Sequence, residues 1–451
     1  MDHSATTKSI KMSKVAVINP PSPFLIDERV FPNMGLVRVA TELDKKHDVD
    51  FHDLSGIKDG ESVIKEIAND YDYYLFGGTT PQFKHTHKLF KALKDENPKA
   101  RTVIGGPHAS AISSLRNKGV FDINTEALYN YDTIFEGEAE QSDNMFKLGW
   151  QKGDLIKSID DVLIPDERFL DRKSYHYYLN GKETTSIQTQ RGCPNQCEFC
   201  CGRDIEMYNK VRQHSPERVI KELDKLHEAG YESFMWYDDE VNINPNRLEE
   251  LCDVLSTRPY QHRGFVTSDQ VVKHPETIKW LKKAGFVKLC TGVESGSDRI
   301  LNVIHKRANS EQNYEAARII KDAGIHYEAF MMIGHPSENP ADVARTIGWI
   351  NKADPDDFDI GILTPYPGSK IYDDAVPSTK FEGYNFEYKG LYFNRPDFSK
   401  EDSYYKGLNT QSASFTRTDE MTEKYIHDKR DKIQEMQKSK KKEKPRMRTK
   451  N

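Results

Sequence analysis

The 451-residue chain is poor in cysteine and has no long apolar run. It holds six cysteines, of which none lies within residues 1–150 and four lie between Cys193 and Cys201. Cys252 and Cys290 are far from that group, so the cysteine pattern argues against a disulfide framework. No window approaches the roughly 18 consecutive apolar residues of a membrane span, and the N-terminus lacks the apolar segment of a signal peptide. We therefore expect a cytoplasmic protein without a membrane span, whose clustered thiols serve metal or redox chemistry.

Charge is distributed unevenly along the chain. The formal net charge is −6, but residues 438–451 (KSKKKEKPRMRTKN) carry +7, so the remainder carries −13. A lysine-rich segment without aromatic residues is typical of a disordered tail, and a weak contact with nucleic acid or an acidic partner is the alternative. Because an acidic body argues against a broad phosphate-binding surface, we do not expect nucleic acid as a partner.

Residues 14–145 alternate short β-rich runs with helical stretches. Five such runs, at 15–20, 49–54, 71–78, 101–106 and 131–138, predict a Rossmann-like, doubly wound parallel sheet. Ligands of such sheets bind at the carboxyl ends of the strands. Small and polar residues follow four of the five runs, among them Thr79, Thr80, Gly105, Gly106 and Pro107. These residues either form a ligand-binding edge or, in the case of the glycines, only permit tight turns.

Residues 183–375 contain six further alternations of strand and helix, after a segment at 146–182 without a clear strand period. The strands are expected within 186–192, 233–239, 263–269, 288–295, 327–334 and 357–367. Eight units would close a full TIM-type barrel, so six predict a partial (βα)6 barrel. The cysteine cluster follows the first strand, on the face where barrels of this type carry their active sites.

Three of the clustered cysteines, Cys193, Cys197 and Cys200, have the spacing C-x3-C-x2-C, and Phe199 precedes the last of them. A zinc site usually takes four protein ligands, and the chain offers no matching second pair. Three thiolates can instead bind three irons of a [4Fe–4S] cluster and leave the fourth iron open. Cys201 lies outside the spacing and is either a bystander, a reserve ligand or a redox partner.

This motif resembles that of the radical S-adenosylmethionine (SAM) superfamily. The resemblance implies that Cys193, Cys197 and Cys200 hold a [4Fe–4S] cluster whose open iron binds the amino and carboxylate groups of SAM. It further implies that an electron from the cluster cleaves SAM to methionine and a 5′-deoxyadenosyl radical, which attacks a C–H bond of a small-molecule substrate. An external electron donor such as flavodoxin or ferredoxin is then required.

Segments at other predicted strand ends are similar to SAM-contacting segments of the superfamily. Asp238, Asp239 and Glu240 follow the second strand, where the family places residues near the SAM amino group; a helix start would also explain acidic residues there. The fourth strand ends in a GVESGS segment with Glu294 and Ser295, and the fifth in IGHPSE with Gly334, near the expected adenine. The TPYPGS segment after the sixth strand is also similar to a segment of that superfamily. We therefore predict that these residues, together with Phe199, bind the cofactor.

The N-terminal block narrows the resemblance to one branch. Its IGGPHAS and EGEAE segments resemble those of radical SAM enzymes with an N-terminal cobalamin-binding domain, which include methyltransferases, oxidative cyclases and ring-contracting enzymes. The resemblance covers roughly residues 14–375 and implies that cobalamin binds at the sheet edge formed by Thr79, Thr80 and residues 105–107. Many cobalamin proteins outside this branch supply a histidine to cobalt through a D-x-H-x-x-G motif, which this chain does not match. Because His52 falls inside a predicted strand, we interpret His52 as a structural residue. In such a methyltransferase cobalt and cluster face one cavity, so the sheet edge should lie over the barrel mouth.

The sequence therefore predicts a radical SAM enzyme that is cobalamin-dependent. A radical SAM enzyme whose N-terminal domain binds no cobalamin and which catalyses a non-methylating reaction is the main alternative. Two further alternatives are weaker. The segments similar to SAM contacts argue against a non-catalytic regulator that binds zinc or a cluster. An RNA-modifying methylthiotransferase usually has cysteines in its N-terminal domain, and residues 1–150 contain none. The C-terminal aromatic residues either stack a flat substrate or pack against the barrel. The expected divisions are a flexible N-terminus (1–13), a B12-binding-like domain (14–145), a linker (146–182), the barrel (183–375), a small α-rich extension or lid (376–437) and a disordered basic tail (438–451).

Overall fold

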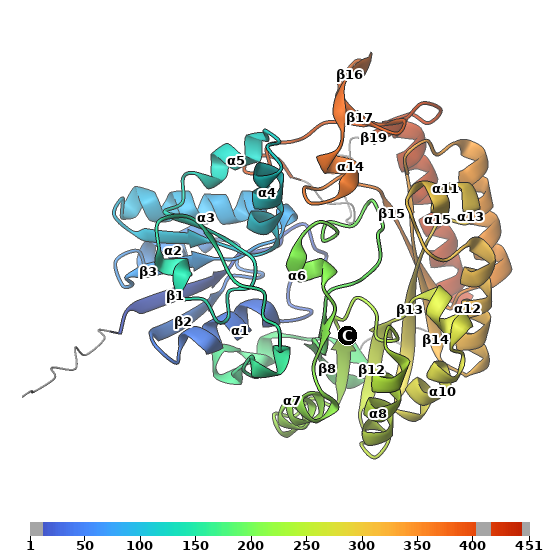
Figure 1. Ribbon diagram of the computed structural model, residues 1–451, viewed down its shortest axis with the longest axis horizontal. Coiled ribbons are helices and arrows are strands. Elements are labelled where there is room, and N and C mark those ends of the chain that lie inside the picture. Colours follow the sequence, from blue (N-terminus) through green and yellow to red (C-terminus); the bar gives the residue numbers. More distant parts are fainter. Residues whose placement is uncertain (1–11, 403–415, 444–451) are drawn as a thin grey trace, which may run out of the picture.

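The computed structural model describes residues 12–402 and 416–443. It shows two α/β units side by side, with a C-terminal sheet between them at the top of the view (Figure 1). Nearly all of the predicted flexible N-terminus and the last eight residues of the predicted basic tail lie outside the described residues. Within the described residues, no helix combines the length and the apolar character that crossing a membrane requires.

The N-terminal unit is a six-stranded parallel sheet with helices on both faces. Its strand order is β2-β1-β3-β4-β5-β6, so the order reverses between β1 and β3. The strands are β1 (Lys14–Asn19), β2 (Asp48–Asp53), β3 (Tyr73–Phe76), β4 (Arg101–Ile104), β5 (Thr133–Glu136) and β6 (Gly149–Lys152), and the helices are α1 (Met34–Leu43), α2 (Gly60–Glu66), α3 (Phe83–Glu96), α4 (Pro107–Asn117) and α5 (Ile123–Leu128). The five predicted strands are present. The sixth, β6, lies in the segment predicted as a linker, and as a short, partly exposed edge strand it carries little apolar signal.

The second unit is a curved sheet of six parallel strands in the order β15-β14-β13-β12-β11-β8, which confirms the predicted partial barrel. A short strand, β7, adds to its edge in antiparallel orientation. The strands are β7 (Tyr178–Leu179), β8 (Lys182–Ile187), β11 (Ser233–Trp236), β12 (Gln261–Phe265), β13 (Phe286–Glu294), β14 (His326–Ile333) and β15 (Asp357–Ile362), and the covering helices are α7 (Pro216–Glu228), α8 (Pro245–Leu255), α9 (Ser268–Lys273), α10 (Glu276–Lys283), α11 (Asp298–Val303), α12 (Ser310–Asp322) and α13 (Pro340–Ala353). The first strand begins four residues earlier than predicted, because its polar start, Lys182-Glu183, does not read as β-rich.

The C-terminal extension is less helical than predicted. After the short helix α14 (Lys370–Asp373), a four-stranded antiparallel sheet is formed by β16 (Val376–Phe381), β17 (Tyr384–Tyr388), β18 (Leu391–Phe393) and β19 (Thr416–Thr418). Only then does the long helix α15 (Glu423–Glu443) follow, packed against β15. Alternating aromatic residues separated by Glu382-Gly383 and Lys389-Gly390 turns explain the sheet. The helix continues to Glu443, so the first six residues of the predicted disordered tail are helical.

The C-terminal extension packs against the N-terminal unit through apolar side chains, most of which are aromatic. Leu391, Phe393 and Phe398 are buried in the same apolar cluster as Ile104 and Ile112 of the N-terminal unit. Of the two interpretations of these aromatics, packing therefore applies to the buried ones. At about 25 cal/mol per Å² of apolar surface removed from water, several buried aromatic side chains hold the extension firmly.

Candidate active site between the two domains

The three motif cysteines lie on one loop that follows β8. Two short strands, β9 (Gln190–Arg191) and β10 (Arg212–Gln213), pair in antiparallel orientation and close the loop at its base. Gly192 has φ +84°, and a Cβ there would lie 2.3 Å from the Lys210 carbonyl oxygen, so only glycine fits this entry to the loop. The Cys193 N–H donates to the Tyr208 carbonyl (2.9 Å) and the Cys200 N–H to that of Cys197 (3.1 Å). The loop is therefore a defined structure that presents three thiols at the carboxyl end of the barrel.

The thiols differ in exposure and surroundings. Cys197 is buried, Cys193 is partly buried, and Cys200 and Cys201 are exposed. Burial raises the pKa of the Cys197 thiol to about 11, and the nearby charge of Lys306 acts in the opposite direction. Within the described residues, no three Cys, His, Asp or Glu side chains converge as ligands of a single metal ion. Three thiols on one loop, with a lysine charge beside them, are a donor set that fits an iron–sulfur cluster with one thiolate for each of three irons.

The three consecutive acidic residues after β11 have different environments. Asp238 is buried and accepts the N–H groups of Thr189 (2.6 Å) and Gln190 (2.9 Å), so its carboxylate fastens the start of the cysteine loop. Burial raises the pKa of Asp238 to about 6, although these bonds oppose the shift. Glu240 accepts a hydrogen bond from the Cys193 thiol (3.2 Å). Burial also raises the pKa of Asp239 and of Glu240.

The ends of β13 and β14 bring the other predicted SAM contacts to the same side. Glu294 has φ +62° at a register shift between β13 and β14, a backbone conformation that costs energy in a non-glycine residue. Its carboxylate pairs with Lys306 (3.3 Å). Ser295 is buried beside Thr346 (Oγ to Oγ1, 3.3 Å), and the Gly334 N–H donates to Glu338 (2.6 Å). Lys306 was missed in the sequence, where an isolated lysine after a short helix carries no signal.

Phe199 also points toward this side. Its ring lies 6.5 Å, centroid to centroid, from that of His335, which follows Gly334. The cysteine loop and the loop after β14 are thus neighbours. Phe199 also packs against the apolar cluster of the N-terminal unit, so it lies where the barrel, the loop and the first domain meet.

A cavity of about 420 Å³ lies between the carboxyl edge of the N-terminal sheet and the cysteine-bearing side of the barrel. From the N-terminal sheet it is lined by Thr79, Gly105, Gly106 and Pro107, and from the barrel side by Gly192, Tyr208, Tyr237 and Asp239. The structure therefore places the sheet edge over the barrel mouth. Of the predicted cobalamin contacts, Thr80 does not line the cavity, because its hydroxyl is bound to buried His108 (3.1 Å).

The cavity continues inward between the sheet and α1. Val17, Leu75, Val103 and Phe135 line it on the sheet side, and Leu36 and Val39 line it on the helix side. This part is an apolar slot that suits a flat organic group. His52 lies away from it in β2, where Nε2 contacts the Tyr71 hydroxyl (3.0 Å).

Buried ion pairs join the two domains beside the cavity. Arg191, two residues before Cys193, bonds to Glu138 (2.6 Å) and Glu140 (2.5 Å), and Arg212 bonds to Glu138 (2.5 Å). None of these side chains is more than 10% exposed. Burial alone would raise the pKa of Glu140, but the charge of Arg191, the hydrogen bonds to the carboxylate and the charge of Arg38 together lower it. The EGEAE segment thus fastens the N-terminal domain to the base of the cysteine loop.

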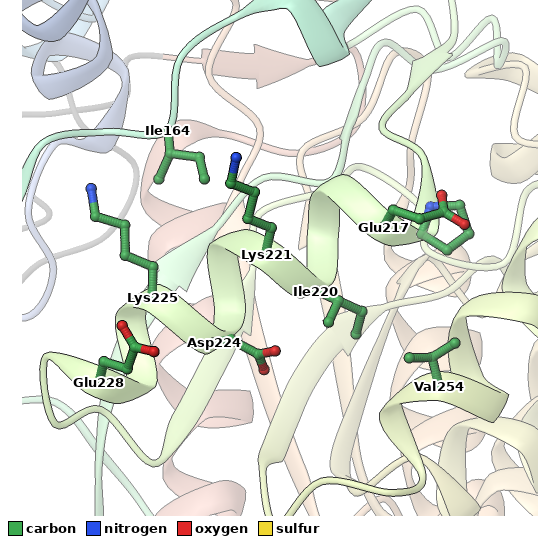
Figure 2. A pocket seen from close by; sticks show the side chains of 9 residues that line it. Ile164, Glu217, Ile220, Lys221, Asp224, Lys225, Glu228 and Val254 are labelled. Carbon is green, nitrogen blue, oxygen red and sulfur yellow. The ribbon is translucent and has the colours of Figure 1, made fainter.

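A larger concave region, of about 650 Å³, lies along the outer side of α7 (Figure 2). Its walls are mostly side chains of that one helix, among them Lys221, Lys225 and Glu228, together with Ile164 and Val254. None of the predicted site residues contributes to it. The smaller cavity between the domains is therefore the candidate site.

Comparison with known proteins agrees with this arrangement. Residues 187–350 match the model of the radical SAM superfamily. The chain is 27% identical over 396 residues to "Uncharacterized methyltransferase PH0819" of Pyrococcus horikoshii. This alignment covers 81% of this chain and 84% of that protein. It is 27% identical over 332 residues to the anaerobic magnesium-protoporphyrin IX monomethyl ester cyclase of Cereibacter sphaeroides, with 68% of this chain and 54% of the cyclase covered.

The fold is also similar to that of a solved structure. This is the radical SAM methyltransferase TsrM from Kitasatospora setae, determined with cobalamin and a [4Fe–4S] cluster bound. The TM-score is 0.59 at 14% identity, over 80% of this chain and 74% of that chain, so the likeness is one of fold. Together, the comparisons identify residues 187–350 as a domain of the radical SAM superfamily, and they show that the fold of the chain is similar to that of TsrM.

Proposed function

We propose that this radical SAM enzyme is cobalamin-dependent, acts on a small molecule, and uses Cys193, Cys197 and Cys200 as the ligands of its [4Fe–4S] cluster. The observation that carries the proposal is the single cavity lined both by the sheet edge at Gly105 and Gly106 and by the cysteine-loop side at Gly192 and Asp239. A reaction that needs a corrin and a SAM-derived radical in one space requires such a cavity. When bound, the cluster and SAM supply the 5′-deoxyadenosyl radical.

The chain's own residues then bind and orient SAM. Asp239 and Glu240 offer carboxylates to the SAM amino group, next to the thiol of Cys193. Glu294, held by Lys306, and Ser295 face the same region from β13, and Gly334 and Phe199 lie near the expected adenine. Asp238 supports the loop that carries these groups and is proposed to act on SAM only through it.

Cobalamin is proposed to bind across the cavity. Its benzimidazole tail is a flat apolar group of the kind that the slot between α1 and the sheet admits, and Thr79, Gly105, Gly106 and Pro107 would contact the corrin side. TsrM, to which the fold is similar, is a methyltransferase with cobalamin bound, which favours methyl transfer. The similarity to a cyclase keeps a different radical reaction as the second candidate.

The test is anaerobic reconstitution of the full chain with iron, sulfide and hydroxocobalamin. Corrin absorption that persists after desalting supports cobalamin binding. The loaded protein is then incubated with SAM and either dithionite or a flavodoxin or ferredoxin system, the proposed class of electron donor. Formation of both 5′-deoxyadenosine and S-adenosylhomocysteine indicates methyl transfer, and deoxyadenosine alone indicates another radical reaction. Absence of both products, or wild-type iron and sulfide content in a Cys193→Ala/Cys197→Ala/Cys200→Ala variant, would refute the proposal.

A further inference from the structure

Glu198, which lies between Cys197 and Phe199 in the cysteine loop, has a fully buried carboxylate. It accepts a hydrogen bond from the Tyr388 hydroxyl (3.0 Å), and the Lys389 ammonium bonds to both of its oxygens (2.9 Å each). His305 Nδ1 lies 3.4 Å away. Tyr388 and Lys389 are some 190 residues further along the chain, at the end of β17. The cysteine loop is therefore bound directly to the C-terminal sheet.

The backbone of Glu198 is fastened as well. Its N–H donates to the carbonyl of Ile304 (3.0 Å), after α11, and its carbonyl accepts from Ile371 N–H (3.2 Å), in α14. One residue of the loop thus connects to three separate elements. A residue whose main chain and side chain are both fixed transmits that rigidity to the cysteine that precedes it.

The lysine that reaches Glu198 sits in an unfavourable turn. Tyr388 pairs with Leu391, so Lys389 and Gly390 form a two-residue hairpin loop with φ +47° and +78°. Such a loop strongly prefers Asn-Gly, because a non-glycine residue at positive φ is otherwise disfavoured. Strain of this kind is kept where the surrounding structure or the function requires it. Here the turn directs an ammonium group to the one buried carboxylate of the cysteine loop.

The same turn also lies against the loop after β14. A Cβ on Gly390 would lie 3.6 Å from the Cα of Ser337, and the Thr418 hydroxyl of β19 donates to the Glu338 carbonyl (2.8 Å). Ser337 and Glu338 follow Gly334, one of the proposed SAM contacts. The C-terminal sheet therefore touches both the cysteine loop and the proposed adenine-side loop.

From these contacts we infer that the β17–β18 turn is a brace across the barrel mouth, and that Glu198, Tyr388 and Lys389 are positioning residues for the cluster. The inference rests on the proposed function, because it assumes that the loop holds a [4Fe–4S] cluster. Two consequences follow from the geometry. Loss of the brace loosens the loop, and loss of one charge of the Glu198–Lys389 pair changes the potential at the cluster.

The two charges act in opposite directions. Glu198→Gln leaves the Lys389 charge without its partner, which favours the reduced cluster and shifts the midpoint potential upward. Lys389→Asn leaves the Glu198 charge and shifts the potential downward. Asparagine also creates the Asn-Gly pair that the turn prefers. Lys389→Asn therefore relieves the turn but leaves the buried Glu198 carboxylate without its ammonium partner, so it should lower the melting temperature and weaken the hold on the cluster.

The experiment compares reconstituted wild type, Glu198→Gln, Lys389→Asn, Tyr388→Phe and the double variant Glu198→Gln/Lys389→Asn. The matched controls are Lys352→Asn and Glu311→Gln, which break an ion pair of similar length (3.1 Å) between α12 and α13. Measured quantities are the melting temperature, the iron and sulfide content, the midpoint potential followed by electron paramagnetic resonance, and the rate of iron loss to an anaerobic chelator. We expect each brace variant to lose iron about tenfold faster than wild type. The potentials of the two single charge variants should shift in opposite directions, and that of the double variant should return toward wild type.

Two results would overturn the inference in distinguishable ways. If wild type assembles a cluster but Glu198→Gln and Lys389→Asn match the controls in potential and in iron loss, the brace has no role at the cluster and the proposed function stands. If wild type assembles no cluster, the proposed function fails and the inference fails with it. A purely structural role predicts that Lys389→Asn lowers the melting temperature and that neither the midpoint potential nor the rate of iron loss changes.

Discussion

Arg191 forms two buried ion pairs across the junction between the two domains. We consider its replacement by methionine, which keeps much of the volume and removes the guanidinium. Arg191 makes two charge-assisted hydrogen bonds, to Glu138 (2.6 Å) and Glu140 (2.5 Å), with side-chain exposures of 10%, 4% and 9%. At about 1.5–3 kcal/mol for each such bond, the loss is about 3–6 kcal/mol. This range agrees with the roughly 3–5 kcal/mol expected when one partner of a buried pair is removed and the other charge stays behind.

The assay is equilibrium unfolding in urea, and unfolding is monitored by tryptophan fluorescence. Protease cleavage within residues 146–182, the segment that joins the two domains, is measured at each urea concentration. Arg191→Met should lower the free energy of unfolding and expose that segment at lower urea concentration. Arg191→Lys should restore part of the loss, because lysine keeps the charge but cannot bond to both carboxylates in the same fork. Arg318→Met is the control, since Arg318 forms similar pairs with Glu315 and Asp322 on an exposed helix face and should change little. Equal behaviour of Arg191→Met and Arg318→Met would refute the assignment of Arg191 to the junction.

Three further predictions concern the proposed site and the loop after β14. Single replacement of Cys193, Cys197 or Cys200 by alanine should remove the cluster absorption and the formation of 5′-deoxyadenosine, whereas Cys201→Ala should keep both; equal losses in all four variants would contradict the ligand assignment. Gly105→Leu should fill the cavity and prevent retention of cobalamin without unfolding the protein, because a Cβ at Gly105 meets only Phe135, at 3.8 Å. The control is Gly348→Leu, because a Cβ at Gly348 has no other atom within 4 Å. Full cobalamin retention in Gly105→Leu would place the corrin elsewhere. Burial raises the pKa of Glu338 from 4.5 to about 8, so the folded protein keeps a proton that the unfolded chain releases. Stability should therefore fall between about pH 4.5 and 8 by on the order of 5 kcal/mol. Glu338→Gln should reduce this fall in a thermal unfolding series; an unchanged pH dependence would show that Glu338 ionises normally.

Much of the fold could be predicted because each element carries its own signal. The barrel strands are apolar runs followed by amphipathic helices, and all six are present in the expected order. Elements with a weak local signal were missed. The edge strand β6 is partly exposed, and β16, β17 and β18 of the C-terminal sheet are short strands joined by two-residue turns. Such elements are stabilised by their neighbours in space rather than by their own pattern.

The residues that support the site could not be predicted, for a related reason. Arg191 and Glu138 are 53 residues apart, and Glu198 and Tyr388 are 190 residues apart. A pairing over such distances leaves no mark at either position of a single sequence. The cysteine spacing, by contrast, is local, so the loop that presents the thiols could be recognised while the side chains that hold the loop could not.

The three acids after β11 show how far a motif can be carried over from a family. In sequence Asp238, Asp239 and Glu240 are equivalent, and all three were predicted to contact the cofactor. The three acids follow the end of β11 at Trp236, and their carboxylates have different neighbours, so they need not share one role. Asp238 turns toward the backbone of Thr189 and Gln190, Asp239 faces the cavity between the domains, and Glu240 turns toward Cys193 and Asn195. Of the three, Asp239 therefore lines the cavity and Glu240 lies beside the Cys193 thiol, whereas Asp238 acts on the site through the loop that it holds.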